Sequence, residues 1–196
     1  MILGRIDEVD GHYIGTRFIL CLPIGSVYVA PRKLGSSVDR LSIRPDGRSI
    51  ALAYGRVWLP LLAIGLLALQ AVSDRIHFAT WGATIAMLAI SVASHRAGRL
   101  PETEKARLRL LGTATGFRID PSKLKQQTRE TKRDSLGELM EKGGLPMTPD
   151  GILSVLDEIP LPALPLVYGY ACYAGDTPEW RTCAVLVQKR YEQVEM

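Results

Sequence analysis

The residues of this chain that could carry chemistry are few and widely spaced. Its histidines and cysteines are His12, His77, His95, Cys21, Cys172 and Cys183. Protein metal sites need such side chains in close pairs or clusters, and no C-x-x-C pair or Cys/His cluster occurs here. The spacing therefore predicts no metal site and no catalytic centre built on histidine or cysteine.

Two other signatures of chemistry are incomplete. The segment Gly112-Thr113-Ala114-Thr115-Gly116 is rich in small residues, but it lacks the lysine and the preceding strand of a phosphate-binding loop. No Gly-x-Ser-x-Gly nucleophile motif occurs. The sequence thus indicates no catalytic, cofactor-binding or metal-binding residue and favours a protein without catalysis. A membrane-bound enzyme whose site assembles from residues distant in the sequence stays an alternative.

The elements that must position the rest of the chain are two apolar stretches, Val57 to Val72 and Phe78 to Ser94. Neither contains Asp, Glu, Lys or Arg. A helix rises about 1.5 Å per residue, so crossing the bilayer core takes about 20 residues. Each stretch approaches that length, and neither has the polar face of a soluble helix. We predict a transmembrane hairpin with spans at about 56–73 and 76–94; the alternative is a buried helical hairpin in a soluble domain.

Residues typical of membrane interfaces stand at the ends of these spans. The predicted interface residues are Arg56, Trp58, Trp81, Arg96 and Arg99. Indole rings are enriched at headgroup level, and a long cationic side chain at a span end can reach the interface. With Arg56 reaching out in this way, the first span can extend back to Ile50.

A second set of residues is predicted to contact other helices within the membrane. Gln70 is polar and uncharged, so a neighbouring helix could satisfy it. In the second span, Ala79 and Ala83, and Gly82 and Ala86, are small residues four positions apart. Such spacing lets two helices approach closely.

Charge predicts the orientation. Cationic residues flank the outer ends at Arg40, Arg44, Arg48, Arg56, Arg96, Arg99, Lys105, Arg107 and Arg109, whereas the link carries Arg75 alone. The positive-inside rule then places both termini in the cytoplasm.

The segment after the hairpin divides by charge. Residues 99–133 hold ten Lys/Arg against four Asp/Glu, and residues 134–196 hold four Lys/Arg against ten Asp/Glu. A basic block beside the membrane suits adhesion to anionic lipid, and without aromatic interleaving or a reader motif it does not predict nucleic-acid binding.

Residues 1–55 are expected to form a small antiparallel β element. Asp10-Gly11 signals one turn, and further turns are predicted at Pro23–Ser26 and at Pro45-Asp46-Gly47. The last turn would join strands at 41–44 and 49–52. The apolar run from 18 to 24 could enter the membrane interface, pack against the membrane helices or form an ordinary buried strand.

Part of this element resembles a segment of many uncharacterised small bacterial membrane proteins. The likeness lies in residues 16–29, TRFILCLPIGSVYV, where Thr-basic-Phe leads through an apolar stretch and a proline to Gly-Ser and an aromatic strand. Two membrane helices follow, as in those proteins. The usual second proline before Gly-Ser is absent. The resemblance implies the bacterial inner membrane as location and no particular activity.

Residues 96–196 are expected to form a helical cytoplasmic domain. Predicted helices cover about 101–114, 133–142, 149–159, 161–174 and 177–191, set by proline and glycine signals at their ends. Aromatic residues in the last two, Tyr168, Tyr170, Tyr173 and Trp180, would either line a groove for a partner peptide or form the core of a small bundle.

Together these patterns predict an α+β membrane protein with the domains 1–55, 56–95 and 96–196. Its partners would be the lipid bilayer and a protein bound through the helical domain or the membrane helices. The favoured function is a membrane-anchored interaction or scaffold protein, and the alternative is an accessory subunit of a membrane transport or envelope complex.

Overall fold

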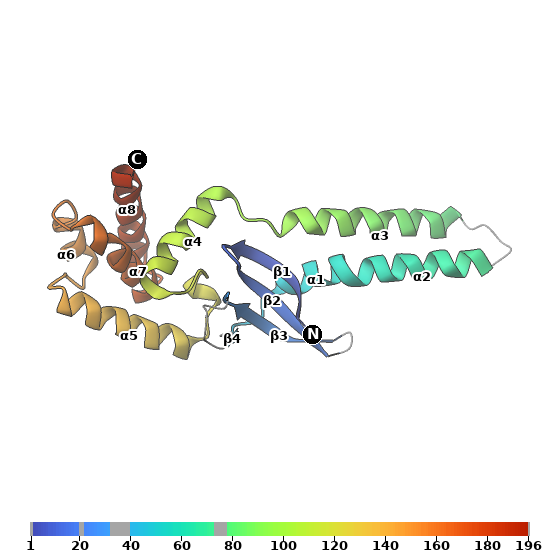
Figure 1. The fold of residues 1–196 in the computed structure, drawn as a ribbon, viewed down its shortest axis with the longest axis horizontal. Helices are drawn as coiled ribbons and strands as arrows, with labels where there is room; N and C mark the ends of the chain where they lie inside the picture. Colours follow the sequence, from blue (N-terminus) through green and yellow to red (C-terminus); the bar gives the residue numbers. More distant parts are fainter. Residues whose placement is uncertain (1, 20–21, 32–39, 73–77, 196) are drawn as a thin grey trace. The chain divides into compact units, whose positions relative to one another are not determined.

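The computed structural model describes residues 2–19, 22–31, 40–72 and 78–195. It divides into two compact units, Met1–Leu100 and Pro101–Met196. The first unit holds a four-stranded sheet and two long apolar helices, and the second is helical (Figure 1). The mixed α+β class with a small antiparallel sheet is as predicted.

The sheet is antiparallel in the order β1-β2-β3-β4. Its strands are β1 Ile2–Val9, β2 His12–Ile19, β3 Leu22–Val29 and β4 Arg40–Ser42. The Asp10-Gly11 turn between β1 and β2 is confirmed, and both residues have positive φ, of 46° and 82°. Asp and Gly tolerate that left-handed backbone, which suits the twist of a tight hairpin. The buried apolar side chains of the sheet include Ile6, Val9, Ile14, Phe18, Val27 and Tyr28.

Two predictions for the first unit are wrong. The expected turn at Pro23–Ser26 lies inside β3, where a register shift between Arg17 and Phe18 absorbs the irregularity as a bulge. The expected strand at 49–52 is part of the helix α1, Gly47–Ala53. Asp46 is the reason, because its carboxylate accepts the backbone N–H groups of Arg48 and Ser49 at 2.9 and 3.4 Å. Asp46 thus caps a helix instead of serving a turn between strands.

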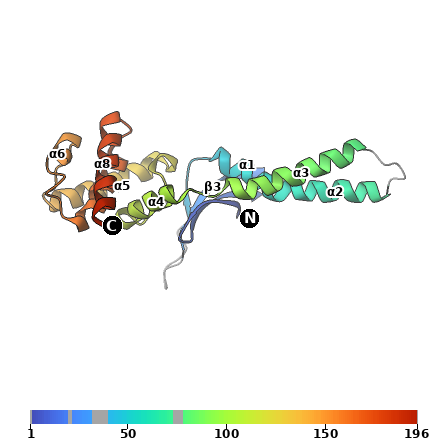
Figure 2. The ribbon, with the colours of Figure 1, turned by 90° about the horizontal axis from the view of Figure 1, so that it is seen from above.

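The two apolar stretches are helical. α1 continues through the π-helical segment η1, Tyr54–Trp58, into α2, Leu59–Val72, while α3 spans Phe78–Ala97. The first continuous helix therefore covers 26 residues and the second 20, each long and apolar enough to cross a membrane. The two run antiparallel side by side (Figures 1 and 2). The first helix extends back through Ile50 to Gly47, whereas the predicted span over this length stays a prediction; the link, with His77, lies outside the described residues.

The second unit is a bundle of short helices around α7. Its elements are α4 Glu102–Thr115, η2 Pro121–Lys123, α5 Gln126–Lys142, α6 Pro149–Ser154, η3 Leu161–Ala163, α7 Leu164–Ala174 and α8 Pro178–Glu195. α7 packs against α4, α5 and α8. Its side chains Leu164, Val167, Tyr168, Ala171 and Tyr173 are buried and form the centre of the core. The predicted helix over 133–142 starts earlier, at Gln126, and the third helix ends earlier, at Ser154.

Candidate functional site

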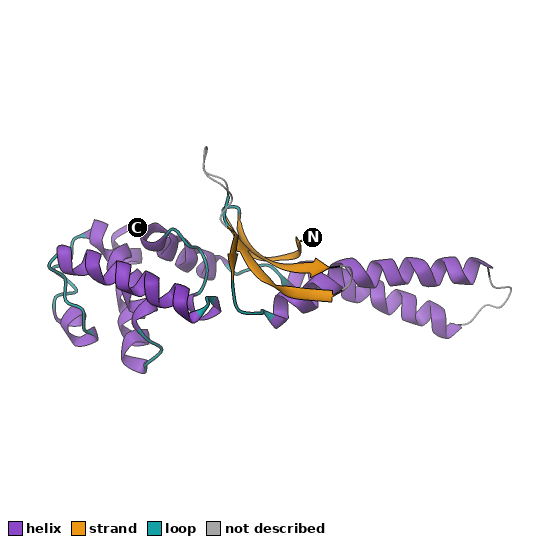
Figure 3. Cartoon of the chain, turned by 90° about the horizontal axis from the view of Figure 1, so that it is seen from below, coloured by secondary structure: helices purple, strands orange, loops and turns teal. Residues whose placement is uncertain are grey.

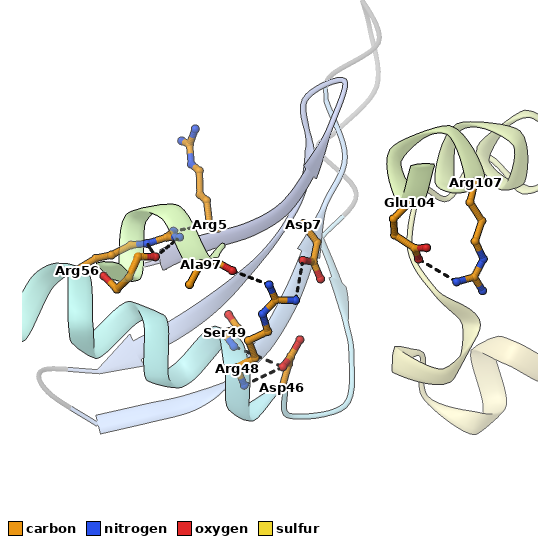
Figure 4. A network of polar contacts seen from close by, with 10 residues as sticks. Arg5, Asp7, Asp46, Arg48, Ser49, Arg56, Ala97, Glu104 and Arg107 are labelled. Carbon is orange, nitrogen blue, oxygen red and sulfur yellow. Dashed lines mark hydrogen bonds and ion pairs between the residues drawn. The ribbon is translucent and has the colours of Figure 1, made fainter. Parts of the chain in front are cut away.

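Two arginines hold the end of α3 within the first unit (Figure 4). Arg56 donates from Nε and Nη2 to the carbonyl of Ser94, at 3.0 and 2.9 Å, and from Nη1 to the carbonyl of Arg5 in β1. Arg48 donates to the carbonyl of Ala97 at 2.6 Å. The last carbonyls of a helix have no partner within it, and positive charge suits that end of the helix dipole. Arg56, predicted as an interface residue, therefore also joins the helical hairpin to the sheet.

Asp7 completes this junction from the sheet side. Its carboxylate lies 3.7 Å from the Arg48 guanidinium, and its backbone N–H donates to the carbonyl of Gly98 at 3.4 Å. The Asp7 side chain is only 8% exposed. Its φ of 53° falls where β1 shifts register against β2, which turns the backbone toward the end of α3. The base of the hairpin is thereby fixed on β1.

The other predicted interface residues occupy both ends of the hairpin. Trp58 is the last residue of η1, just before α2, and is half-buried, with its indole Nε1 enclosed by protein. Trp81 lies near the start of the antiparallel α3, hence at the opposite end, and is 47% exposed. Arg96 and Arg99 are exposed in the last turn of α3 and just beyond it. This distribution places an indole near each end of the hairpin and cations near its base.

The contact between the two long helices uses hydroxyl side chains. On α3, Thr84, Ser91 and Ser94 are buried, and the amide of Gln70 on α2 donates to the hydroxyl of Thr80. Ala63 is the buried residue of α2. The hydroxyls are satisfied locally, because Thr84 donates to the Thr80 carbonyl at 2.9 Å and Ser94 to the Ser91 carbonyl at 2.6 Å. Polar groups in an apolar helix pair are tolerated when they find such partners.

The small residues predicted for helix contact lie on another face of α3. Ala79, Gly82, Ala83 and Ala86 are exposed, and their contact with another helix stays a prediction, whereas the Gln70 amide bonds the hydroxyl of Thr80 on α3. The signal that sequence reasoning missed is the spacing of the hydroxyl residues at 80, 84, 91 and 94. Those intervals of four, seven and three follow the heptad repeat of a helix seam.

In the second unit, the four aromatic residues divide between core and cavity. Tyr168, Tyr170 and Tyr173 are buried, as the bundle-core alternative predicted, and Trp180 is half-buried with its ring edge-on to Tyr170 at 5.6 Å. Tyr168 and Trp180 also line a cavity of about 470 Å³. Its other lining residues include Arg107, Asp120, Cys172, Arg181, Val185 and Gln188, from α4, the η2 cap, α7 and α8. Of the four aromatic residues predicted to line a partner groove, Tyr168 and Trp180 line this cavity, whereas Tyr170 and Tyr173 do not.

Arg107 is the most connected side chain of this cavity. Its Nε donates to the Tyr168 hydroxyl at 3.2 Å, Nη1 to Glu104 at 2.9 Å and Nη2 to Asp120 at 3.1 Å. Desolvation acts to lower the pKa of Arg107, but its contacts with Tyr168, Asp120 and Glu104 raise it above its usual range. Burial acts to raise the pKa of Asp120, and hydrogen bonds from Ser122 and Arg107 lower it below its usual range. Both groups therefore stay charged at neutral pH and hold each other in place.

The thiol and the phenol that line the cavity are neutral. Burial raises the pKa of the Cys172 thiol to about 11, and burial also raises that of the Tyr168 hydroxyl. A protonated thiol is a poor nucleophile, and each guanidinium nitrogen of Arg107 donates to a side chain of this unit. The arrangement offers an aromatic wall and a polar floor, which favours binding over covalent chemistry.

The remaining residues of interest are dispersed. His12 hydrogen-bonds the Tyr28 hydroxyl through Nδ1 at 2.6 Å, and His95 is exposed in the last turn of α3. Cys183 is fully buried in the core. Among the described residues, no group of three or more His, Cys, Asp or Glu side chains could hold a metal ion.

We compared the chain with known protein families, curated proteins and solved structures. No protein-family model, curated protein or solved structure matches this chain. Any functional conclusion must therefore come from the side chains themselves.

Proposed function

We propose that this chain is a membrane-anchored interaction protein of the bacterial inner membrane. The hairpin of α2 and α3 would be the anchor, with both termini in the cytoplasm, and the helical unit would bind a protein partner. No catalysis is required of it.

The observation that carries the proposal is the apolar surface of the hairpin. Only 17% of the apolar window of each long helix is buried. Large side chains that remain exposed include Leu61, Leu62, Ile64, Leu69, Val72, Phe78, Ile85, Ile90 and Val92. Soluble monomers rarely expose contiguous apolar patches of more than a few hundred Å². Acyl chains are the simplest cover for a helix pair that is apolar on every outward side.

The cavity supports the interaction role of the second unit. It opens beside α8, where Val185 and Leu186 are 52% and 38% exposed. Trp180 forms one wall, and Arg181 is exposed next to it. An aromatic wall flanked by apolar and cationic side chains suits an apolar anchor residue from a partner segment.

Site-specific crosslinking in the native host membrane tests this role. A photoreactive amino acid at Val185 should form one discrete adduct with a partner protein, and Trp180→Ala should abolish that adduct. Leu139 on α5 is the matched control, because it is apolar and 48% exposed but does not line the cavity. The absence of an adduct from Val185, or the same adducts from both positions, would refute the interaction role of the cavity.

A second candidate is an accessory subunit of a membrane complex. It is favoured by the exposed small residues of α3, which lie off the face that contacts α2. A photoreactive residue at Ala83 should then capture another membrane helix, whereas Leu61 on α2 should not. A hairpin that stays monomeric in lipid, with no adduct at Ala83, excludes this role.

A further inference from the structure

One end of the sheet exposes three large apolar side chains. Ile19 at the end of β2 is 62% exposed, and Leu22 and Ile24 at the start of β3 are 70% and 53% exposed. Ile19 and Leu22 are register partners and so lie side by side on the sheet. In the described part of the sheet, large apolar side chains exposed to this degree occur only here. These three residues are called the apolar tip below.

The opposite face of the same strand ends is also apolar. Phe18 alternates with Ile19, is 3% exposed and packs edge-on against Tyr54 of η1, with ring centroids 5.7 Å apart. Pro23, the register partner of Phe18, is half-buried. In an ordinary half-buried sheet, apolar inward positions alternate with polar outward positions. At this end of the sheet the outward positions carry large apolar side chains that stay exposed, so these side chains need an apolar cover of their own.

The tip lies at the level where the hairpin would enter the bilayer. The contact of Phe18 with Tyr54 fixes β2 beside η1, and Trp58 follows Tyr54 by four residues, or roughly 6 Å along a helix. The strand ends continue past this contact by about 3.3 Å per residue. Figures 1 and 3 agree in placing the ends of β2 and β3 alongside the start of α2. The apolar tip therefore lies at about the same height along the hairpin as Trp58, which is one of the predicted interface residues.

Positive charge lies directly behind the tip. Arg17 is exposed two residues before Ile19, hence on the same face of β2. Arg5 on β1 is exposed, with its guanidinium 4.6 Å from the centre of the Tyr13 ring. An apolar end backed by cations matches the order of acyl chains and anionic headgroups in a leaflet.

From these observations we propose that the apolar tip inserts into the boundary between headgroups and acyl chains, in the leaflet that the base of the hairpin crosses. The occupant is lipid, because the tip continues the apolar surface of the anchor and cations stand behind it. This inference rests on the membrane anchorage proposed above and adds a third, monotopic contact to the two spans. The sheet would then be held against the membrane and not merely tethered to it.

Depth-dependent quenching in the full-length protein tests the proposal. Single cysteines replace Leu22, Leu61 or Glu8 in a chain whose native cysteines are removed, and each is labelled with an environment-sensitive dye. The protein is reconstituted into vesicles of phosphatidylcholine and phosphatidylglycerol, with or without nitroxide on the acyl chains. Leu61, 53% exposed on α2, reports the anchor. Glu8, exposed near the other end of β1, reports water.

If the tip inserts, the dye at position 22 should emit at a shorter wavelength than the dye at position 8. The nitroxide should quench the dye at position 22 about as strongly as the dye at position 61. This quenching should be at least about twofold stronger than that of the dye at position 8. Quenching at Leu61 without quenching at Leu22 refutes tip insertion and leaves the anchor standing. A shift at Leu22 without quenching means that protein covers the tip and also refutes insertion. Loss of quenching at Leu61 refutes the anchor itself. Ile24→Cys repeats the measurement if Leu22→Cys fails to fold by circular dichroism.

Discussion

The two long helices approach closely at Gly55 but not at Gly65, so replacing each glycine by alanine should change the stability of the hairpin in opposite directions. A Cβ added at Gly55 would lie 2.9 Å from the Cβ of Ser94 and 3.1 Å from its hydroxyl oxygen. A Cβ added at Gly65, in the same continuous helix, meets nothing within 4 Å. Gly55→Ala should therefore destabilise the hairpin, whereas Gly65→Ala should leave it unchanged or stabilise it.

The magnitude follows from the contact distances. Carbon atoms pack best at about 3.5–4.0 Å, so Ser94 would have to move by roughly 0.6–1 Å. Overpacking of this kind costs about 1–3 kcal/mol. Replacing a helical glycine by alanine gains about 0.5–1 kcal/mol. The net loss for Gly55→Ala is therefore centred on about 1 kcal/mol and reaches about 2.5 kcal/mol at most, and the Gly65→Ala variant should instead gain up to about 1 kcal/mol.

Tryptophan fluorescence can follow this difference in the full-length protein. In a Trp180→Phe background the signal comes from Trp58 and Trp81, which both belong to the hairpin. The protein is unfolded in dodecyl maltoside micelles by added sodium dodecyl sulfate. Adding Ser94→Gly to Gly55→Ala should recover part of the loss, because it removes the atoms that clash. Equal midpoints for the two alanine variants would show that the helices do not approach at Gly55.

Three predictions concern the cavity of the second unit. Asp120→Asn should cost about 1 kcal/mol at pH 7. Because the pKa of the folded carboxyl is lowered, its stabilisation is full above the unfolded value of about 3.9 and disappears as pH falls through the folded pKa. Thermal melts at pH 7 and pH 2 check this, and an equal loss at both would contradict the ion pair. Cys172 should alkylate slowly at pH 7 and about tenfold faster per pH unit toward its pKa of about 11. Cys183, buried at 0% exposure, should stay protected, and mass spectrometry separates the two. Tyr168→Phe should lower the free energy of unfolding by about 1 kcal/mol, because the Nε of Arg107 loses its acceptor; an unchanged denaturation midpoint would argue against that hydrogen bond.

Several features of the fold followed from local patterns in the sequence. Two long runs without charge predicted the paired helices, and Asp10-Gly11 predicted the first hairpin turn. Proline and glycine signals placed most of the helices in the second unit. These predictions hold because the backbone preferences of a few adjacent residues, or apolarity on all sides, decide them.

Other features could not be read along the chain. Pro45-Asp46-Gly47 is compatible with a turn or with a helix cap, and only the docking of α1 on the sheet selects the cap. The face of α3 that meets α2 carries the buried Thr84, Ser91 and Ser94, and the sequence did not predict that face. Both choices depend on which partner surface is present, and that is a tertiary property.

By itself, the sequence determined that the middle of the chain must be covered by something apolar, and its spacing of histidines and cysteines predicted no metal site. Only the tertiary structure decided which side chains meet. Arg107 and Tyr168 are 61 positions apart, yet their hydrogen bond helps to form the cavity. Likewise, the packing of Phe18 on Tyr54 helps to hold the end of β2 beside η1. The physical reason is that periodicity encodes which face of an element is apolar, whereas the free energy of packing selects its partner.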